Sequence, residues 1–308
     1  MATKQHGAAL ILAIMVVALA ATIAVFMAAQ QSTWTQQAGN LAARAQTSAL
    51  THAAIDWARG ILAEDARNSP VDHLAEPWAS RLPAIPVDSA TLSGAINDQQ
   101  ARFNLNNLVR NGADSESDIA LFKRLLEQLK LPSDLVNPLL DWVDVDSLQR
   151  TSGGAEDAYY LLADPPYRCA NRALLSVEEL YRVRGFNPAI VERLRPFVSA
   201  LPEHSTINVN TASREILMAL LPDFTETDIS TVLDNRKQAF YKSKQDFRAR
   251  LPQPAPGLND AAFDVASRFF SVVVVARAHL TVTSYEALLA RPSNNGWPTL
   301  VWQRELAE

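Results

Sequence analysis

The sequence predicts an α+β protein in which a long N-terminal membrane helix packs on a small antiparallel sheet, with a large all-α domain inserted between the strands. Three observations support this fold class. Residues 8–29 form an uncharged apolar run, strand-like segments lie near both ends of the remaining chain, and helical periodicity fills residues 114–266. Strands that flank a helical segment of this size indicate one sheet interrupted by an insertion.

The apolar run from Ala8 to Ala29 contains no charged residue, and Thr22 carries its only hydroxyl. About 20 apolar residues suffice for a helix to cross ~30 Å of hydrocarbon. A secretory signal has a shorter apolar core of about 7–15 residues, so cleavage behind the run is disfavoured. A permanent anchor and a helix preceded by a removable leader both remain open. Lys4 favours a cytoplasmic N-terminus, with the bulk of the chain on the other side of the membrane.

The helix is predicted to continue to about Asp65, because residues 30–65 contain no proline. At 1.5 Å per residue, a helix over residues 8–65 is about 85 Å long. Apolar residues in its second half recur near helical spacing, which predicts one face covered by a domain. These residues are Leu50, Ala54, Trp57, Ile61 and Leu62.

Residues 68–88 contain four prolines, which end the helix and predict an extended connector. The apolar residues from Leu92 to Leu105 then predict two short strands, joined near Asn97 and Asp98.

The strongest strand patterns lie near the C-terminus. Arg268–Ala278 and Leu280–Leu289 are rich in β-branched residues that alternate with polar ones, and a final strand is predicted at Thr299–Gln303. We therefore assign residues 66–113 and 267–308 to one α/β domain.

The insertion, residues 114–266, has apolar faces at helical spacing in Leu121–Leu129 and Leu135–Trp142. Ser176–Glu179 is predicted to be a capping box. Gly185 is predicted to turn the chain into the next helix. This succession of helix, turn and helix resembles helix-hairpin-helix and SAM-like domains.

That resemblance suggests a rival function, in which turn amides bind a DNA backbone. Such sites need a G-x-G hairpin flanked by Lys or Arg, yet Val183–Asn187 has one glycine and Leu221–Phe224 has none. A net charge of −5 and a pI of about 5.6 also argue against sequence-independent binding to nucleic acid. We therefore predict no nucleic-acid partner. The single cysteine, Cys169, excludes an intrachain disulfide and is expected to be a small buried residue.

The segment Asp141–Tyr160 has carboxylates at alternate positions, then a glycine turn and two further carboxylates. Hard cations such as calcium take six to eight oxygen ligands from carboxylates, carbonyls and water. The loop is not an EF-hand, because Leu148 stands where Asp or Asn is expected and the glycines come late. A solvated acidic turn and a metal site both remain open.

Motifs for catalysis are missing from the sequence. It has no G-x-S-x-G, no H-E-x-x-H and no phosphate-binding glycine loop, and its five histidines show no ligand spacing. Asp141 with Asp144, and His204 with Ser205, are only fragments of catalytic sites. We therefore predict that the protein is not an enzyme.

The residues before the apolar run resemble a leader of the prepilin type. In Gly7–Ile14 the glycine directly precedes the membrane helix, and in that class a dedicated prepilin peptidase cuts after it, here between Gly7 and Ala8. Most members carry Glu at the fifth mature position, whereas this chain has Leu12. The absence of that glutamate resembles one subtype, the K-class minor pseudopilins of bacterial type II secretion systems.

The resemblance to the K class extends over most of the chain. The matching motifs, in order, are Asn97–Asn106, Asp141–Tyr160, Leu174–Leu180 and Ile207–Ala212. It implies a leader at residues 1–7, a membrane and rod helix at residues 8–65 with a methylated N-terminus, and a pseudopilin domain interrupted by residues 114–266.

The resemblance also implies roles for individual residues. Asp144, Asp146, Glu156 and Asp157 are expected to bind a structural calcium ion, with Asp141 as a further candidate on the preceding helix. Leu12 is expected to matter for assembly. In the family, the fifth-position carboxylate of one subunit pairs with the N-terminal amine of its neighbour, and a subunit at the tip has no such neighbour. Leucine there avoids an unpaired charge in an apolar setting.

The implied function is to cap the pseudopilus tip together with the I-class and J-class minor pseudopilins. The protein would initiate assembly of the major pseudopilin on the inner-membrane platform and support export of folded proteins through the secretin. Its implied location is the inner membrane of a Gram-negative bacterium, with one span and most of the chain in the periplasm. The alternative is a membrane-anchored periplasmic binding protein whose helix-hairpin-helix-like domain holds a ligand, with DNA as one candidate.

Overall fold

The structure is a computed structural model that describes residues 6–292 and 296–306. Residues 1–5, which hold most of the expected leader and Lys4, lie outside the described residues.

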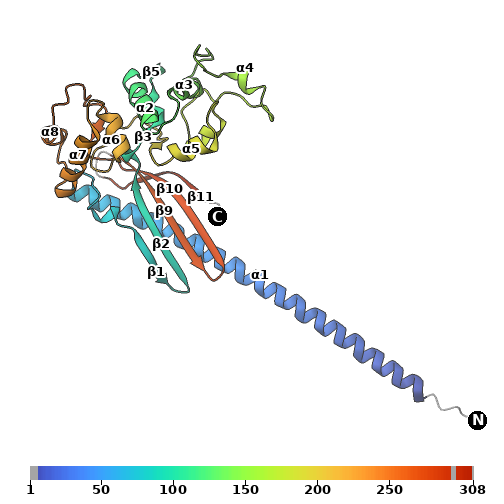
Figure 1. Cartoon of the computed structure of the whole chain (residues 1–308). Helices are drawn as coiled ribbons and strands as arrows, with labels where there is room; N and C mark the ends of the chain where they lie inside the picture. Colours follow the sequence, from blue (N-terminus) through green and yellow to red (C-terminus); the bar gives the residue numbers. More distant parts are fainter. Residues whose placement is uncertain (1–5, 293–295, 307–308) are drawn as a thin grey trace, which may run out of the picture.

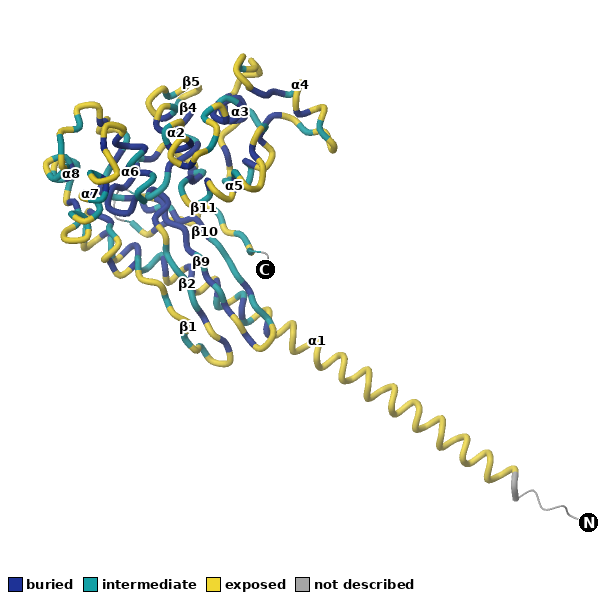
Figure 2. Tube along the Cα trace, in the orientation of Figure 1, coloured by how far each residue is buried: buried dark blue, intermediate teal, exposed yellow. Residues whose placement is uncertain are grey.

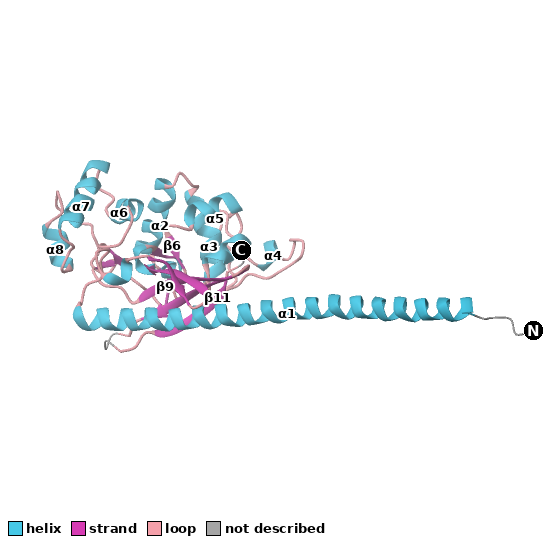
Figure 3. Cartoon of the chain, turned by 90° about the horizontal axis from the view of Figure 1, so that it is seen from below, coloured by secondary structure: helices cyan, strands magenta, loops and turns pink. Residues whose placement is uncertain are grey.

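The N-terminal helix, α1 (His6–Asn68), is one unbroken helix of 63 residues. It confirms the predicted long helix and extends slightly past Asp65. Figure 3 shows it as a straight rod that projects far beyond the rest of the molecule. The projecting half is exposed along its whole length, whereas the other half lies against the sheet (Figure 2).

The stripe of α1 that packs on the sheet differs from the predicted one. Ala54, Ile55, Ala58 and Leu62 are buried, but Trp57 is 52% exposed. Successive helix residues point about 100° apart, so Trp57 lies well to one side of the stripe that contains Ala58. The prediction for Trp57 is therefore wrong.

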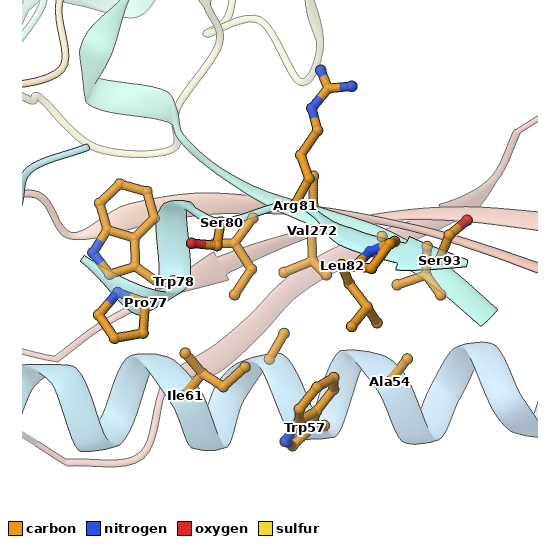
Figure 4. Close-up of a pocket in the computed structure, with 16 residues that line it drawn as sticks. Ala54, Trp57, Ile61, Pro77, Trp78, Ser80, Arg81, Leu82, Ser93 and Val272 are labelled. Atoms are coloured by element: carbon orange, nitrogen blue, oxygen red, sulfur yellow. The ribbon is translucent and has the colours of Figure 1, made fainter. Parts of the chain in front are cut away.

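Trp57 instead lines a hollow of about 310 Å³ between α1 and the edge of the sheet. Figure 4 shows Leu82 pointing from the sheet toward the helix, with Trp78 at one end, while Arg81 points away.

In the described residues, the main sheet is antiparallel and has five strands in the order β1-β2-β9-β10-β11. The strands are β1 (Leu82–Val87), β2 (Ala90–Asp98), β9 (Phe269–Ala278), β10 (Thr281–Ala290) and β11 (Thr299–Glu305). The three predicted C-terminal strands are confirmed. Because β2 pairs directly with β9, residues 99–268 form an excursion between two neighbouring strands (Figure 1).

The region predicted as an extended connector contains β1, which is an edge strand. Pro83 and Pro86 are tolerated there because an edge strand has one side without ladder hydrogen bonds. The pairing of β1 with β2 shifts register between Leu82 and Ile85. A strand was missed because prolines argue against one everywhere except at an edge.

The prediction of two strands between Leu92 and Leu105 is confirmed in outline, although the second, β3 (Phe103–Asn104), has only two residues and lies outside the main sheet. The first strand, β2, runs through Asn97 to Asp98. There the Gln100 amide donates to Asp98 Oδ1 at 2.8 Å, and this cap starts a 3₁₀ turn that leads the chain out of the sheet.

The excursion contains short helices and several two-residue strand pairs. Its α-helices are α2 (Glu116–Gln128), α3 (Val136–Val143), α4 (Asp157–Tyr160), α5 (Pro188–Leu194), α6 (Arg214–Leu220), α7 (Glu226–Gln238) and α8 (Lys244–Ala249). Its short strands are β3 (Phe103–Asn104) with β6 (Val198–Ser199), β4 (Val109–Arg110) with β5 (Ala113–Asp114), and β7 (Ile207–Asn208) with β8 (Phe263–Asp264). It is mainly helical but not all-α as predicted.

The main hydrophobic core of the molecule lies in this excursion. The apolar faces predicted for α2 and α3 are buried in it, and so is Cys169. The core also includes Phe103, Leu105 and Leu108, upstream of the predicted start of the insertion at residue 114.

The predicted capping box at Ser176 is wrong. Residues Val177–Arg182 form a 3₁₀ helix, and the Ser176 side chain caps no amide in the described structure. Glu179 instead accepts a hydrogen bond from the Leu175 amide at 2.8 Å. A true capping box, between Thr225 and Asp228, begins α7.

Glu178 ties the excursion to the last strand. Its carboxylate accepts hydrogen bonds from Arg195 at 2.6 Å and from Arg304 of β11 at 2.9 and 3.1 Å. Burial alone would raise the pKa of Glu178, but the two arginines outweigh that effect and hold its pKa at about 2.

We expect Glu178→Gln to lower the stability of the folded chain by about 1 kcal/mol at pH 7, because the side chain is partly exposed and solvent screens the pair. A folded pKa below the ordinary value of 4.5 stabilises the native state above pH 4.5, and that contribution is lost as the pH falls toward 2. Urea unfolding of the full chain in detergent should therefore show a difference in the free energy of unfolding between the native chain and the variant. This difference should narrow as the pH falls from 4.5 toward 2. Replacement of the exposed Glu127 by Gln is the control. A difference in the free energy of unfolding between the native chain and Glu178→Gln that does not vary with pH would contradict the account.

Candidate functional site

The acidic loop after α3 brings three of the five predicted ligands together. One carboxylate oxygen from each of Asp144, Asp146 and Glu156 lies within 4.8 Å of the others. Asp144 ends α3 as its C-cap, and Glu156 is the N-cap of α4, so two helix ends position the pair. Asp144 and Glu156 are only 5% and 4% exposed, whereas Asp146 is exposed.

The buried oxygens of this group lack hydrogen-bond donors. Three oxygens, both of Glu156 and Oδ1 of Asp144, have no hydrogen-bond partner within residues 6–292 and 296–306. Burial raises the pKa of both carboxyl groups, and the neighbouring carboxylates raise them further. An unpaired buried carboxylate costs several kcal/mol unless a proton or a cation compensates it. These residues therefore fit a hard cation that takes oxygen ligands.

Arg150 balances the other side of the loop. Its guanidinium donates to Asp141 Oδ1 at 2.6 Å, to Asp144 Oδ2 at 2.5 Å and to Asp114 Oδ1 at 2.7 Å. Its amide also donates to Asp141 Oδ2 at 3.2 Å. Both oxygens of the fully buried Asp141 are thus occupied, which places this candidate ligand in an ion pair rather than in the three-carboxylate group.

Asp157 also lies outside the three-carboxylate group. It is the first residue of α4, and its Oδ1 accepts a hydrogen bond from the Cys169 amide at 2.9 Å. The buried Cys169 thiol donates to the Asp141 carbonyl at 3.3 Å, and burial raises its pKa to about 12. These contacts hold the return of the chain against α3.

Gly154 allows the loop to close on Asp141. A Cβ at this position would lie 2.2 Å from Asp141 Oδ2 and 2.7 Å from both the amide nitrogen and the carbonyl oxygen of Arg150. Sequence reasoning found the glycine turn but missed Arg150. The available signal was one basic residue inside a run of carboxylates.

The two fragments of catalytic sites form no catalytic arrangement in the structure. Asp141 and Asp144 both form an ion pair with Arg150, which occupies an oxygen of each carboxylate. The buried Ser205 Oγ has no hydrogen-bond partner in the described part of the chain, so no base contacts it.

The projecting half of α1 is the second candidate site. Among the described residues, α1 is the one helix long and apolar enough to cross a membrane, and its most apolar window is wholly exposed. Leu12 lies in this window and is 62% exposed. Ala8 is also exposed.

Comparison with known proteins places this architecture. Two family models, both described as type II secretion system (T2SS), protein K, match residues 101–203 and 207–266. The type II secretion system protein K of Aeromonas hydrophila is 32% identical over 95% of each chain. That of Pseudomonas aeruginosa is 34% identical over 87% of this chain and 84% of its own.

The chain belongs to the type II secretion system protein K family. It is therefore a minor pseudopilin, as the order of the motifs indicated. The members of this family are structural components of the type II secretion system.

The fold agrees with this assignment. The structure matches a chain in the crystal structure of the GspK-GspI-GspJ complex from the type 2 secretion system of enterotoxigenic Escherichia coli. The match has a TM-score of 0.75 and 23% identity, and it covers 86% of this chain and 97% of the other. The α+β fold with a long N-terminal helix, an antiparallel sheet and an inserted mainly helical part is thereby confirmed.

Proposed function

We propose that this minor pseudopilin caps the tip of the pseudopilus, together with minor pseudopilins of the I and J classes. The observation that carries the proposal is the position of the excursion, residues 99–268. It forms a bulky mass at the end of α1 opposite the membrane half (Figure 1). Subunits of a helical fibre stack through their N-terminal helices, and such a mass would obstruct a subunit placed above it. The related chain from Escherichia coli was crystallised in a complex with GspI and GspJ, which supports this choice of partners.

In this proposal the protein acts before the fibre grows and has no catalytic role. Prepilin peptidase cuts between Gly7 and Ala8, and the mature helix stays in the inner membrane of a Gram-negative bacterium. The rest of the chain lies in the periplasm. The tip complex then accepts the major pseudopilin beneath it on the assembly platform, and the growing fibre moves folded proteins toward the secretin.

Leu12 suits a terminal subunit for an electrostatic reason. In shaft subunits of this class, a carboxylate at the fifth mature position meets the N-terminal amine of a neighbour. At the tip that carboxylate would remain unpaired in an apolar environment. A carboxylate within a membrane span costs about 2.5–3.5 kcal/mol, and leucine avoids this cost.

We expect Leu12→Glu to reduce fibre initiation and protein secretion at least tenfold, because the unpaired charge disfavours the tip position by more than about 1.4 kcal/mol. Leu12→Met, which nearly conserves volume and polarity, should behave like the native chain. Secretion assays in cells that lack the native protein measure the effect, after membrane levels of the variants are matched. Native secretion by Leu12→Glu would show that the position is permissive and that the electrostatic argument is wrong.

We further propose that the loop formed by Asp144, Asp146 and Glu156 binds a structural calcium ion. The unpaired oxygens of the two buried carboxylates support the proposal. Calcium would supply the missing positive charge and tie the end of α3 to the start of α4. Binding to the folded state alone stabilises a protein by about 2.7 kcal/mol at a ligand concentration of 100 Kd.

Two opposite effects should follow from Glu156→Gln. In chelator the variant should melt at a higher temperature than the native chain, because an uncompensated buried charge has been removed. Calcium should raise the melting temperature less in the variant than in the native chain, because a ligand has been lost. The exposed Asp134→Asn should respond to calcium like the native chain. Equal calcium responses of the native chain and Glu156→Gln would assign the loop to a solvated acidic turn instead.

A further inference from the structure

A second group of buried carboxylates lies where α1 ends. One oxygen from each of Asp65, Asp72 and Glu76 lies within 4.8 Å of the others. Asp65 is in the last turns of α1, and the other two are in the segment that leads to β1. Asp72 and Glu76 are 1% and 7% exposed, so two of the three acids are withdrawn from solvent.

Positive charge around this group is insufficient. Arg291, which follows β10, contacts Asp72 Oδ2 and lies 2.9 Å from Asp65 Oδ2. His73 Nε2 lies 3.8 Å from Glu76 Oε1 and adds a charge only when it is protonated. With His73 neutral, three carboxylates face one guanidinium.

One buried oxygen of the group also lacks a donor. Asp72 Oδ1 has no hydrogen-bond partner among the residues that the structure describes. The other oxygen, Oδ2, accepts from the Ser267 amide at 2.6 Å and from Arg291. Two hydrogen bonds to Glu76 are likewise accepted by one of its oxygens: Oε2 accepts from the His73 amide and from Trp78 Nε1, each at 2.8 Å.

The spacing of the group suits a hard divalent cation. Calcium binds oxygen at 2.3–2.6 Å, so two oxygens on opposite sides of the ion are about 4.8 Å apart. Three carboxylate oxygens within that span can share one coordination sphere, and carbonyls or water can complete it. Magnesium demands a tighter octahedron at about 2.0–2.1 Å, which makes calcium the better probe.

We propose that Asp65, Asp72 and Glu76 form a second calcium-class cation site, separate from the loop after α3. This site ties the end of α1 to the excursion. The Asp72 amide donates to the Val265 carbonyl at 3.0 Å, and Asn208 Nδ2 donates to the Asp72 carbonyl at 3.1 Å. A cation bound there connects three parts of the molecule: the end of α1, Arg291 directly after β10, and the excursion. It therefore sets how firmly the excursion is held on the rod.

The test uses the full chain in detergent, stripped of metal and titrated with calcium by calorimetry. Glu156→Gln removes a proposed ligand of the loop, and this variant should still bind one calcium ion. Adding Glu76→Gln should weaken the remaining binding at least tenfold. Glutamine is nearly isosteric and retains an oxygen that accepts from Trp78, so this change leaves the contacts of Arg291 in place. Glu64→Gln, on the exposed side of α1, is the matched control and should leave the remaining binding unchanged.

A second measurement locates the ion. Trp78 donates to Glu76, so terbium bound at the second site should emit when tryptophan is excited, and Trp78→Phe should reduce this emission in the Glu156→Gln background. If the double variant does not fold, Asp65→Asn in the same background should lower calcium affinity at least tenfold. The proposal is overturned if Glu156→Gln binds no calcium, or if Glu76→Gln and Asp65→Asn both bind it as the native residues do. If Glu76→Gln weakens calcium binding but Glu156→Gln leaves it unchanged, the second site is supported and the loop site is contradicted.

Discussion

The structure depends on one packing contact, between a narrow stripe of α1 and strands β9 and β10. Ala54, Ala58 and Leu62 in this stripe meet Val272 and Val274 of β9 and Ala287 of β10. Small residues let the helix approach the sheet closely, and the fully buried Leu62 contributes about 1.5–3 kcal/mol by burial alone. This contact holds the C-terminal half of α1 against the sheet. The sheet therefore determines the direction in which the projecting, apolar half continues.

The mainly helical excursion is anchored to that frame by polar contacts at two places. At one end Asp98 ends β2 and accepts hydrogen bonds from Thr211 at 2.6 Å and Ser267 at 2.7 Å. Near the middle of the excursion, Glu178 joins it to β11 through Arg304. These polar contacts fix a large body beyond the end of the rod without extending the sheet. This arrangement is the basis of the proposed role as a terminal subunit.

Much of the fold could be predicted because its signals are local. An uncharged run, a stretch without proline and alternating β-branched residues are each sufficient for α1, β9 and β10. The rotation of α1 that exposes Trp57 could not be predicted, because it depends on which side chains of the sheet face the helix. The acidic loop was found from its carboxylates, but the separation of Asp141 from Asp144 and Glu156 depends on Arg150. The group formed by Asp65, Asp72 and Glu76 matches no sequence motif. Its environment could not be predicted either, because Arg291 is distant in sequence and only the fold brings it beside these residues.

The position of this subunit in the fibre tests the account most directly. A small label inserted at the exposed Gly257, where added atoms meet nothing within 4 Å, would mark the excursion without disturbing its core. Electron microscopy of pseudopili assembled with the labelled chain should find the label at one end of each fibre. Labels at regular intervals along the shaft would contradict the account, because they would show that the excursion does not block stacking.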